Sequence, residues 1–397
     1  MTEIFLSIFF ISVLLLFLST GVWVALSMIG VSTIAMTLFT SRPVGDAMAT
    51  TIWGTSSSWT LTALPLFVWM GEILFRTKLS ENLFEGLSPW MQKLPGGLIH
   101  VNVVGCALFA AISGSSAATV ATVGKMSIPE LRKRNYPEKI LLGSLAGSGT
   151  LGLLIPTSII LIIYGVTVQE SIAKLFVAGI VPGIMIALIF MSYVILWSLF
   201  NKKQMPNIVN QYSFIDKIKR SGQLIPVIIL ILSVIGSIYT GIATATEAAS
   251  LGVVGALILS YFQKSLSWSN FKSSLLGATK TSCMISFILA GSAFLSLSMG
   301  FTGLPRNLAI WINSLELSPY ILIFVLMIFY IILGMFLDGI SAVVLTMAII
   351  EPMIRQAGFD MIWFGIFLVV VVEMAQITPP VGFNLFVLQG MAGKDMG

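Results

Sequence analysis

The sequence predicts an all-α integral membrane protein made of two inverted-topology repeats, each with a re-entrant helical hairpin and a broken transmembrane helix. Its composition, its long apolar runs and a recurring spacing between matched residues support this fold class. Hydrophobic residues make up 57% of the 397-residue chain and charged residues only 9%, with a mean hydropathy of +1.00. A soluble domain carries about 25% charged residues. With so few charges, most of the surface is suited to lipid rather than to water.

Long apolar runs recur along the chain, each able to cross roughly 30 Å of hydrocarbon. They cover residues of about 3–19, 22–40, 98–123, 140–165, 172–200, 223–239, 243–262, 318–348 and 361–391. Two further stretches, 43–76 and 270–312, are interrupted midway by small polar residues, at Gly54–Ser58 and at Gly291–Ser292. We expect each of them to form two half-spanning helices folded at a tip inside the membrane. Residues 80–93 predict an amphipathic helix on the membrane surface.

Basic residues predict the orientation. Loops 125–139 and 201–222 are rich in lysine and arginine, whereas the breaks near 166–171 and 240–242 contain neither. Both basic loops are therefore expected in the cytoplasm, with the N-terminus outside. The stretch 76–93 stays unassigned, because acidic residues offset its basic ones. This distribution accounts for the net charge of +5 without a nucleic-acid partner.

An internal repeat follows from matched prolines. Pro129 and Pro352 are 352 − 129 = 223 positions apart, and Pro156 and Pro379 are 379 − 156 = 223 apart. Each half then has two spans, a hairpin and two interrupted spans, and the basic loops give the halves opposite orientations. Paired inverted repeats with broken helices are typical of secondary transporters.

The repeat divides the chain into four predicted parts. These are scaffold helices at 1–42, a first transport segment at 43–165 with hairpin, surface helix and broken helices, scaffold helices with a cytoplasmic loop at 166–269, and a second transport segment at 270–397. The counterpart of the run at 172–200 would begin near 172 + 223 = 395. We therefore expect that a final helix is missing, either because the protein lacks it or because this sequence is truncated.

A row of small and hydroxyl side chains occupies residues 110–119. Close helix packing is one interpretation. We favour the other, an unwound stretch whose carbonyl and hydroxyl oxygens bind a cation. Adding 223 to Ser115 gives Asp338, a carboxylate inside an apolar run, which is costly there unless it is paired or coordinating.

The matched prolines mark a second pair of candidate sites, Pro156-Thr157-Ser158 and Thr378-Pro379-Pro380. Proline inside a span frees a carbonyl that would otherwise accept a helix hydrogen bond, and such oxygens suit sodium. A plain helix kink is the alternative. Asn384, one turn further on, adds an amide for a substrate.

Several function classes find no support. The sequence has no phosphate-binding loop of the Gly-x-x-x-x-Gly-Lys-Ser/Thr type, no Cys/His metal set and no nucleophile–base spacing. We expect neither an enzyme nor a cofactor. A permease subunit of an ATP-driven importer remains an alternative, because the energy module could lie on another chain. An ion channel, or a membrane enzyme using Asp338, is less well supported.

At these residues the chain resembles the large membrane subunit of tripartite ATP-independent periplasmic (TRAP) transporters. The family usually has Pro-Pro where this chain has Pro156-Thr157. The similar segments are 109–119, 152–158, 244–249, Gly303-Leu304-Pro305 with Leu308-Ala309, and 378–382.

The resemblance implies a sodium-driven importer of organic acids that works by an elevator motion in the bacterial inner membrane. It implies two partners: a separate small membrane subunit of four helices and a periplasmic substrate-binding protein. It also implies that membrane lipid surrounds the protein and that sodium is the coupling ion. The substrate is left open among C4-dicarboxylates, sialic acid, keto acids and other carboxylates or sulfonates.

The resemblance also places sodium at the hairpin tips and at the unwound loops that face them. The predicted sodium-binding residues are Ser56, Ser57, Gly114, Ser115, Ser116, Gly291, Ser292, Asp338, Gly339, Ser341, Thr378 and Pro379. The predicted substrate-binding residues are Ser58, Trp59, Thr119, Pro156, Thr157, Ser158 and Asn384.

Overall fold

The computed structural model describes residues 2–77, 79–206, 212–305, 307, 310, 318–335, 337–379 and 382–392, and all regular secondary structure in these ranges is helical. The prediction of an all-α membrane protein is confirmed for these residues. Helices that are long and apolar enough to cross a membrane alone are α10 (Ile172–Phe200), α13 (Ala245–Phe262), α14 (Trp268–Thr302) and α17 (Gly339–Gln356). Outside the described residues lie Leu308, Ala309, Pro380, Val381 and the segment 393–397, on which the expectation of a missing helix rests.

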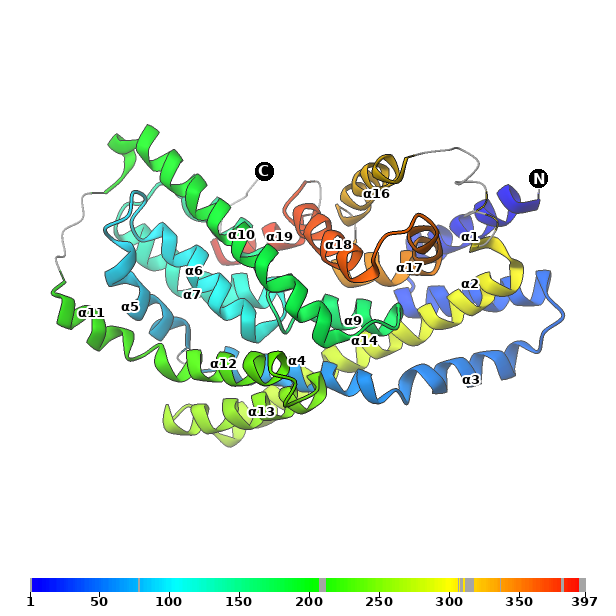
Figure 1. The fold of residues 1–397 in the computed structure, drawn as a ribbon, viewed down its shortest axis with the longest axis horizontal. Coiled ribbons are helices and arrows are strands. Elements are labelled where there is room, and N and C mark those ends of the chain that lie inside the picture. The colour runs from blue at the N-terminus through cyan, green and yellow to red at the C-terminus, as the bar shows by residue number, and fades with distance from the viewer. Residues whose placement is uncertain are drawn as a thin grey trace.

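One group of helices, at the right and lower side of Figure 1, joins the two halves of the chain. α14 packs along α2 (Val24–Phe39) and also contacts α3 (Val44–Ser56) and α4 (Ala63–Phe75). Gly291 makes the contact with α2 close, since a Cβ there would lie 2.8 Å from the Ala25 carbonyl oxygen. Small residues permit such close approach. Flanking helices are α1 (Thr2–Ser19), which packs on α2, and α12 (Ile225–Tyr239), which packs on α13.

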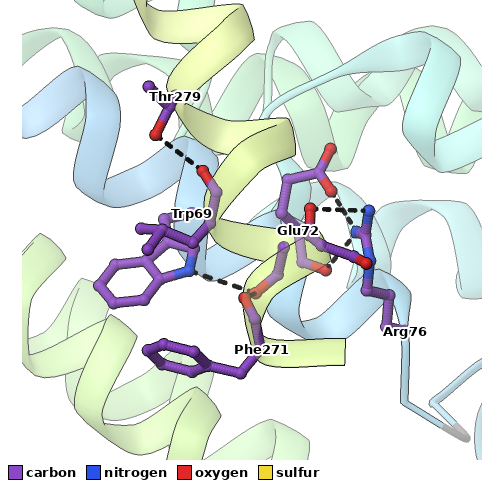
Figure 2. A network of polar contacts seen from close by, with 8 residues as sticks. Trp69, Glu72, Arg76, Phe271 and Thr279 are labelled. Atoms are coloured by element: carbon purple, nitrogen blue, oxygen red, sulfur yellow. Dashed lines mark hydrogen bonds and ion pairs between the residues drawn. The ribbon is translucent and has the colours of Figure 1, made fainter. Parts of the chain in front are cut away.

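Polar contacts fix α4 against α14 (Figure 2). The Trp69 indole N–H donates to the Ser274 hydroxyl oxygen at 3.3 Å. Arg76 forms an ion pair with Glu72 and donates to the Ser273 carbonyl oxygen at 3.3 Å. The arginine thereby ties the end of α4 to the second half of the chain.

The predicted second hairpin is wrong. Residues 268–302 form the single helix α14, with Gly291 and Ser292 inside it. Gly291 packs against Ala25, and the Ser292 hydroxyl donates to the Val344 carbonyl oxygen at 2.7 Å. A glycine and a serine inside a membrane helix are packing residues here, so the sequence interruption does not break the helix.

The predicted first hairpin is also wrong in shape. The helix does stop at Ser56, as expected, and resumes in the short helix η1 (Trp59–Thr62) and α4. The two segments are bent by only 53°. The chain therefore continues across the break in roughly its original direction, whereas a re-entrant hairpin must reverse it.

Two other segments do fold back on themselves. α6 (Ile99–Ser113) and α7 (Ser116–Lys133) are joined by two residues and lie side by side in Figure 1, with Gly105 packed against Val123. α16 (Pro319–Gly334) is joined to α17 by a short connection, and the Tyr330 hydroxyl meets the Thr346 hydroxyl at 2.6 Å. We call these pairs the first and second hairpins. The sequence predicted the runs 98–123 and 318–348 as interrupted spans instead.

The helix interruptions predicted at the matched prolines are confirmed. The first lies between α8 (Glu138–Gly149), with its extension η2 (Thr150–Leu153), and α9 (Ile159–Thr167); the second lies between α18 (Met361–Gln376) and α19 (Phe383–Ala392). We call these the first and second breaks. Helix bounds repeat at the predicted spacing: α7 and α17 begin at 116 and 339 and end at 133 and 356, both 223 apart.

The surface helix appears as α5 (Leu79–Met91), with Leu83 and Leu87 buried. It packs on α11 (Phe214–Ser221) of the basic loop 201–222. The Trp90 indole N–H donates to the Ser221 hydroxyl at 2.7 Å. The segment whose side was left open therefore lies on the same side as this basic loop.

Gly291→Ala should destabilise the protein, whereas Gly300→Ala should not. Both glycines lie inside α14, so alanine brings the same gain in helix propensity of about 1 kcal/mol. A Cβ at 291 meets the Ala25 carbonyl oxygen at 2.8 Å, whereas a Cβ at 300 meets nothing within 4 Å. Forcing α2 and α14 apart should cost about 1–3 kcal/mol. Thermal unfolding in detergent measures this, and equal Tm values for the two variants would contradict the packing.

Candidate functional site

The tip of the first hairpin is a tight, hydrogen-bonded turn. Gly114 ends α6 in the left-handed region at φ +61°, and Ser115 caps α7 by accepting from the Ala118 N–H at 3.4 Å. The Thr119 hydroxyl donates to the Ser115 carbonyl oxygen at 2.7 Å and meets the Ser113 hydroxyl at 2.8 Å. Hydroxyl and carbonyl oxygens are therefore concentrated within one turn of the tip.

This tip sits directly on the first break. The Ile159 N–H, at the start of α9, donates to the Gly114 carbonyl oxygen at 3.1 Å. A Cβ on Gly114 would lie 2.3 Å from the Thr157 carbonyl oxygen, and one on Gly152 would lie 2.7 Å from the Ser115 carbonyl oxygen. Only glycine allows the two backbones to approach this closely. The structure thus brings predicted residues from both segments together.

The first break holds strained and unpartnered groups. Thr157 has φ +85°, which is unusual for a β-branched residue. Its hydroxyl is buried and has no hydrogen-bond partner in the part of the chain that the structure describes. Ser158 is fully buried and caps α9 by accepting from the Leu161 N–H at 3.2 Å. Strain of this kind persists where the surroundings fix the backbone, and it is frequent at ligand sites.

The second hairpin tip is capped by a carboxylate. Asp338 is exposed and accepts from the Ile340 and Ser341 N–H groups at 3.1 Å each, as the N-cap of α17. A Cβ on Gly339 would lie 2.7 Å from Gln376 Nε2 and 2.6 Å from Ile160 Cδ1. The second tip therefore meets both the end of α18 and the start of α9.

Gln376 connects the two hairpin tips, and sequence reasoning missed it. Its Oε1 accepts from the Ser116 hydroxyl at 2.9 Å, while its Nε2 abuts Gly339. The residue is 3% exposed. A polar side chain two positions before Thr378 in an apolar run was the available signal.

The second break contains further buried polar groups. The Thr378 hydroxyl donates to the Met374 carbonyl oxygen at 2.6 Å, and Pro379 is exposed. Asn384 is fully buried, and neither its amide oxygen nor its nitrogen has a hydrogen-bond partner among the described residues. Glu373, which was not in the predicted site, also has a buried carboxylate oxygen that no described residue meets with a hydrogen bond.

The region where the hairpin tips meet the helix breaks is called the centre below. The break at Ser56–Ser58 does not lie in it. α4 reaches the first tip through Gly71, whose Cβ would lie 3.3 Å from Ser113. Ser58 precedes Gly71 by 13 residues, which is about 20 Å of helix. Ser56 and Ser57 are exposed, and Ser58 and Trp59 line a separate cleft of about 860 Å³ together with Glu170 and Thr244. Their predicted place at a hairpin tip is wrong.

Gly291 is likewise not at a tip, since it faces α2. Ser292 contacts α17 at Val344, about one turn beyond Ser341. Across the described part of the chain, no group of three or more His, Cys, Asp or Glu side chains is placed to hold a metal. The donors that do gather at the tips are hydroxyl and carbonyl oxygens, which are hard ligands.

Gly114→Ala should be more destabilising than Gly21→Ala. Both glycines have positive φ, +61° and +78°, so alanine carries a similar penalty of about 1–2 kcal/mol at each. A Cβ at 21 meets nothing within 4 Å, whereas one at 114 collides with the Thr157 carbonyl oxygen. The difference in thermal stability between the variants therefore measures the contact between tip and break. Similar stability would show that this contact is not tight.

Known proteins are similar to this chain in sequence, and a solved structure is similar to it in fold. The family described as "Tripartite ATP-independent periplasmic transporter, DctM component" matches residues 11–397. The C4-dicarboxylate TRAP transporter large permease protein DctM of Pseudomonas aeruginosa is 32% identical over 88% of this chain and 82% of its own length. The 2,3-diketo-L-gulonate TRAP transporter large permease protein YiaN of Escherichia coli is 31% identical over 87% of this chain and 81% of its own.

A third relative is the isethionate TRAP transporter permease protein DctMQ of Oleidesulfovibrio alaskensis, 32% identical over 96% of this chain but only 60% of its own length. Among solved structures, the Alcanivorax borkumensis YdaH transporter, described as having an unusual topology, matches with a TM-score of 0.62 at 13% identity. That match covers 96% of this chain and 90% of the other, and at this identity it speaks for the fold alone.

The family's description as ATP-independent removes the support for an ATP-driven permease. The many apolar helices agree with a multi-pass membrane protein. The chain therefore belongs to the DctM component family of tripartite ATP-independent periplasmic transporters, and it is a transporter permease rather than an enzyme.

Proposed function

We propose that this chain is the large permease of a sodium-coupled importer that carries small organic acids across the bacterial inner membrane. The observation that carries the proposal is the meeting of a hairpin tip and a helix break at Gly114 and Thr157. Hydroxyl and carbonyl oxygens gather there beside buried polar groups without partners. Broken helices that meet in this way hold ions and substrates in secondary transporters.

The electrostatics of the centre favour an anion accompanied by cations. Four helices, α7, α9, α17 and α19, begin at the tips and breaks. Their N-terminal ends carry partial positive charge that attracts an anionic group. An organic anion entering a low-dielectric site alone faces a large desolvation cost. Co-bound sodium offsets that charge, and this is the physical basis for coupling.

The proposed sodium ligands come from the two tips and the facing breaks. The first site uses Gly114–Ser116 with the carbonyl oxygen of Thr157. The second uses Asp338–Ser341 with Thr378. We omit Ser56, Ser57, Gly291 and Ser292, since they do not lie at a tip.

The substrate class follows from the relatives together with the centre. The names of the three relatives refer to C4-dicarboxylate, 2,3-diketo-L-gulonate and isethionate. We infer a small carboxylate or sulfonate for this chain. The Asn384 amide and the Thr157 hydroxyl, buried and unpartnered, supply donors for it.

We also propose how the parts move. The two hairpins with the two broken helices form a transport unit, and α1 to α4 with α12 to α14 form the scaffold. The two halves have opposite orientations in the membrane, and the transport unit slides as an elevator. The 223-residue repeat of helix bounds and the continuous length of α14 support this division.

Two partners complete the proposed transporter: a periplasmic substrate-binding protein at the outer face and a separate four-helix small membrane subunit. The family's description as tripartite supports this number. The relative called DctMQ, of which the match spans only 60%, is consistent with an additional membrane part.

Uptake by proteoliposomes containing the chain and both partners tests the function. We expect accumulation of radiolabelled organic acid when sodium is higher outside, and none in equal sodium. The vesicles hold no ATP. Uptake that is unchanged after sodium is replaced by potassium would refute the coupling.

Ser115→Ala and Thr378→Ala should each raise the sodium concentration for half-maximal uptake about tenfold, because loss of one ligand oxygen weakens sodium binding by about 1.4 kcal/mol. Ser56→Ala is the matched control, since Ser56 is exposed and lies away from both tips. We expect it to behave like the wild type. A raised half-maximal sodium concentration in Ser56→Ala alone would contradict the proposed sodium ligands.

Asn384→Ala should raise the KM for the organic acid about tenfold or more, because a hydrogen bond to a charged group contributes about 1.5–3 kcal/mol. Its sodium dependence should stay near that of the wild type. Initial rates of uptake at saturating sodium measure the effect. An unchanged KM would mean that the buried amide does not contact substrate.

A further inference from the structure

A second cleft lies at the opposite end of α6 and α7 from the first hairpin tip. It has a volume of about 320 Å³ and is formed by the loop between α5 and α6, by Tyr136 after α7, and by the end of α10 with the short helix η3 (Lys202–Gln204). Its basic lining residues are Lys93 and Lys202. The described residues that line it include no aspartate or glutamate. The cleft is therefore suited to an anion.

Tyr136 provides a buried donor in this cleft. Its side chain is 8% exposed, and its hydroxyl oxygen accepts from the Leu98 N–H at 3.0 Å. Among the described residues the O–H of Tyr136 has no hydrogen-bond acceptor, so it is free to donate. Gly97 has φ +54°, and a Cβ there would lie 2.5 Å from the Tyr136 hydroxyl oxygen. Because Gly97 has no Cβ, the Tyr136 hydroxyl has room to lie at the cleft.

An exposed apolar stripe on α10 leads away from the cleft. Leu199 lines the cleft and is 44% exposed. Ile195 and Leu188 precede Leu199 by four and eleven residues, with the exposed Ser192 between them. This spacing places them on the same helix face as Leu199, and Leu188 is 57% exposed. From 188 to 199 the stripe is about 17 Å long, close to the depth of one leaflet.

We propose that this cleft binds the phosphate group of an anionic phospholipid, with an acyl chain lying along the α10 stripe. Two ammonium groups and a free phenol O–H match the oxygens of a phosphate. Lys202 belongs to the basic loop predicted to face the cytoplasm, where the leaflet is anionic and attracts basic residues. Free phosphate shares the headgroup chemistry, but the adjoining apolar stripe favours a lipid. The inference does not rest on the proposed transport function.

Lipid binding to the purified chain tests this, with phosphatidylglycerol compared with phosphatidylcholine and with inorganic phosphate. Delipidated protein in detergent is titrated, and bound lipid is counted by native mass spectrometry. We expect clear preference for phosphatidylglycerol and no competition by millimolar phosphate. Lys93→Ala/Lys202→Ala should weaken that binding about thirtyfold, since each lysine near a membrane surface contributes about 1 kcal/mol.

Lys203→Ala is the matched control, because Lys203 neighbours Lys202 but does not line the cleft. It should bind phosphatidylglycerol like the wild type. Tyr136→Phe keeps the ring and removes the donor, so it should weaken binding severalfold while both lysines remain. Equal affinity of the double variant and Lys203→Ala would overturn the proposal, as would full competition by phosphate. Loss of lipid binding when a small membrane subunit is added would also overturn it, since the stripe would then be a protein interface.

Discussion

A helix that stops inside a membrane leaves backbone N–H and C=O groups that hydrocarbon cannot satisfy. In this protein the hydrogen bond from the Ile159 N–H to the Gly114 carbonyl oxygen meets that constraint. The start of one broken helix satisfies the end of a hairpin helix. Gly114 and Gly152 are required because any side chain there would strike the facing backbone. The rest of the centre depends on this contact, since it brings the hydroxyls of the tip to the strained Thr157.

The second half of the chain joins the same centre through Gln376. Its amide oxygen accepts from Ser116 at the first tip, while its nitrogen abuts Gly339 at the second. One side chain therefore contacts both tips. In the sodium-coupled carrier that we propose, this contact would link the two sodium sites directly. The α14 helix is continuous and packs closely on α2 at Gly291, so it also joins the two halves of the chain.

The sequence predicted well those features that follow from local backbone chemistry. Pro156 and Pro379 mark real helix interruptions, because proline removes a donor and clashes with the preceding turn. Their 223-residue spacing then recurs in the helix bounds. The hairpins were misplaced, because Gly291–Ser292 has the composition of a tip but is a packing contact. The run 98–123 resembles one span, since α6 and α7 are joined by only two residues. Gln376 stands out locally only as a polar residue in an apolar run, and its role depends on contacts with residues 260 and 37 positions away.

Hydrogen–deuterium exchange with and without sodium tests the central claim most directly. If the tips and breaks together bind the coupling ion, sodium should slow amide exchange at 110–119, 153–160 and 337–342 in parallel. Residues 54–60, which lie away from the tips, should exchange at the same rate in both conditions. Protection confined to 54–60, or no protection anywhere, would contradict the account.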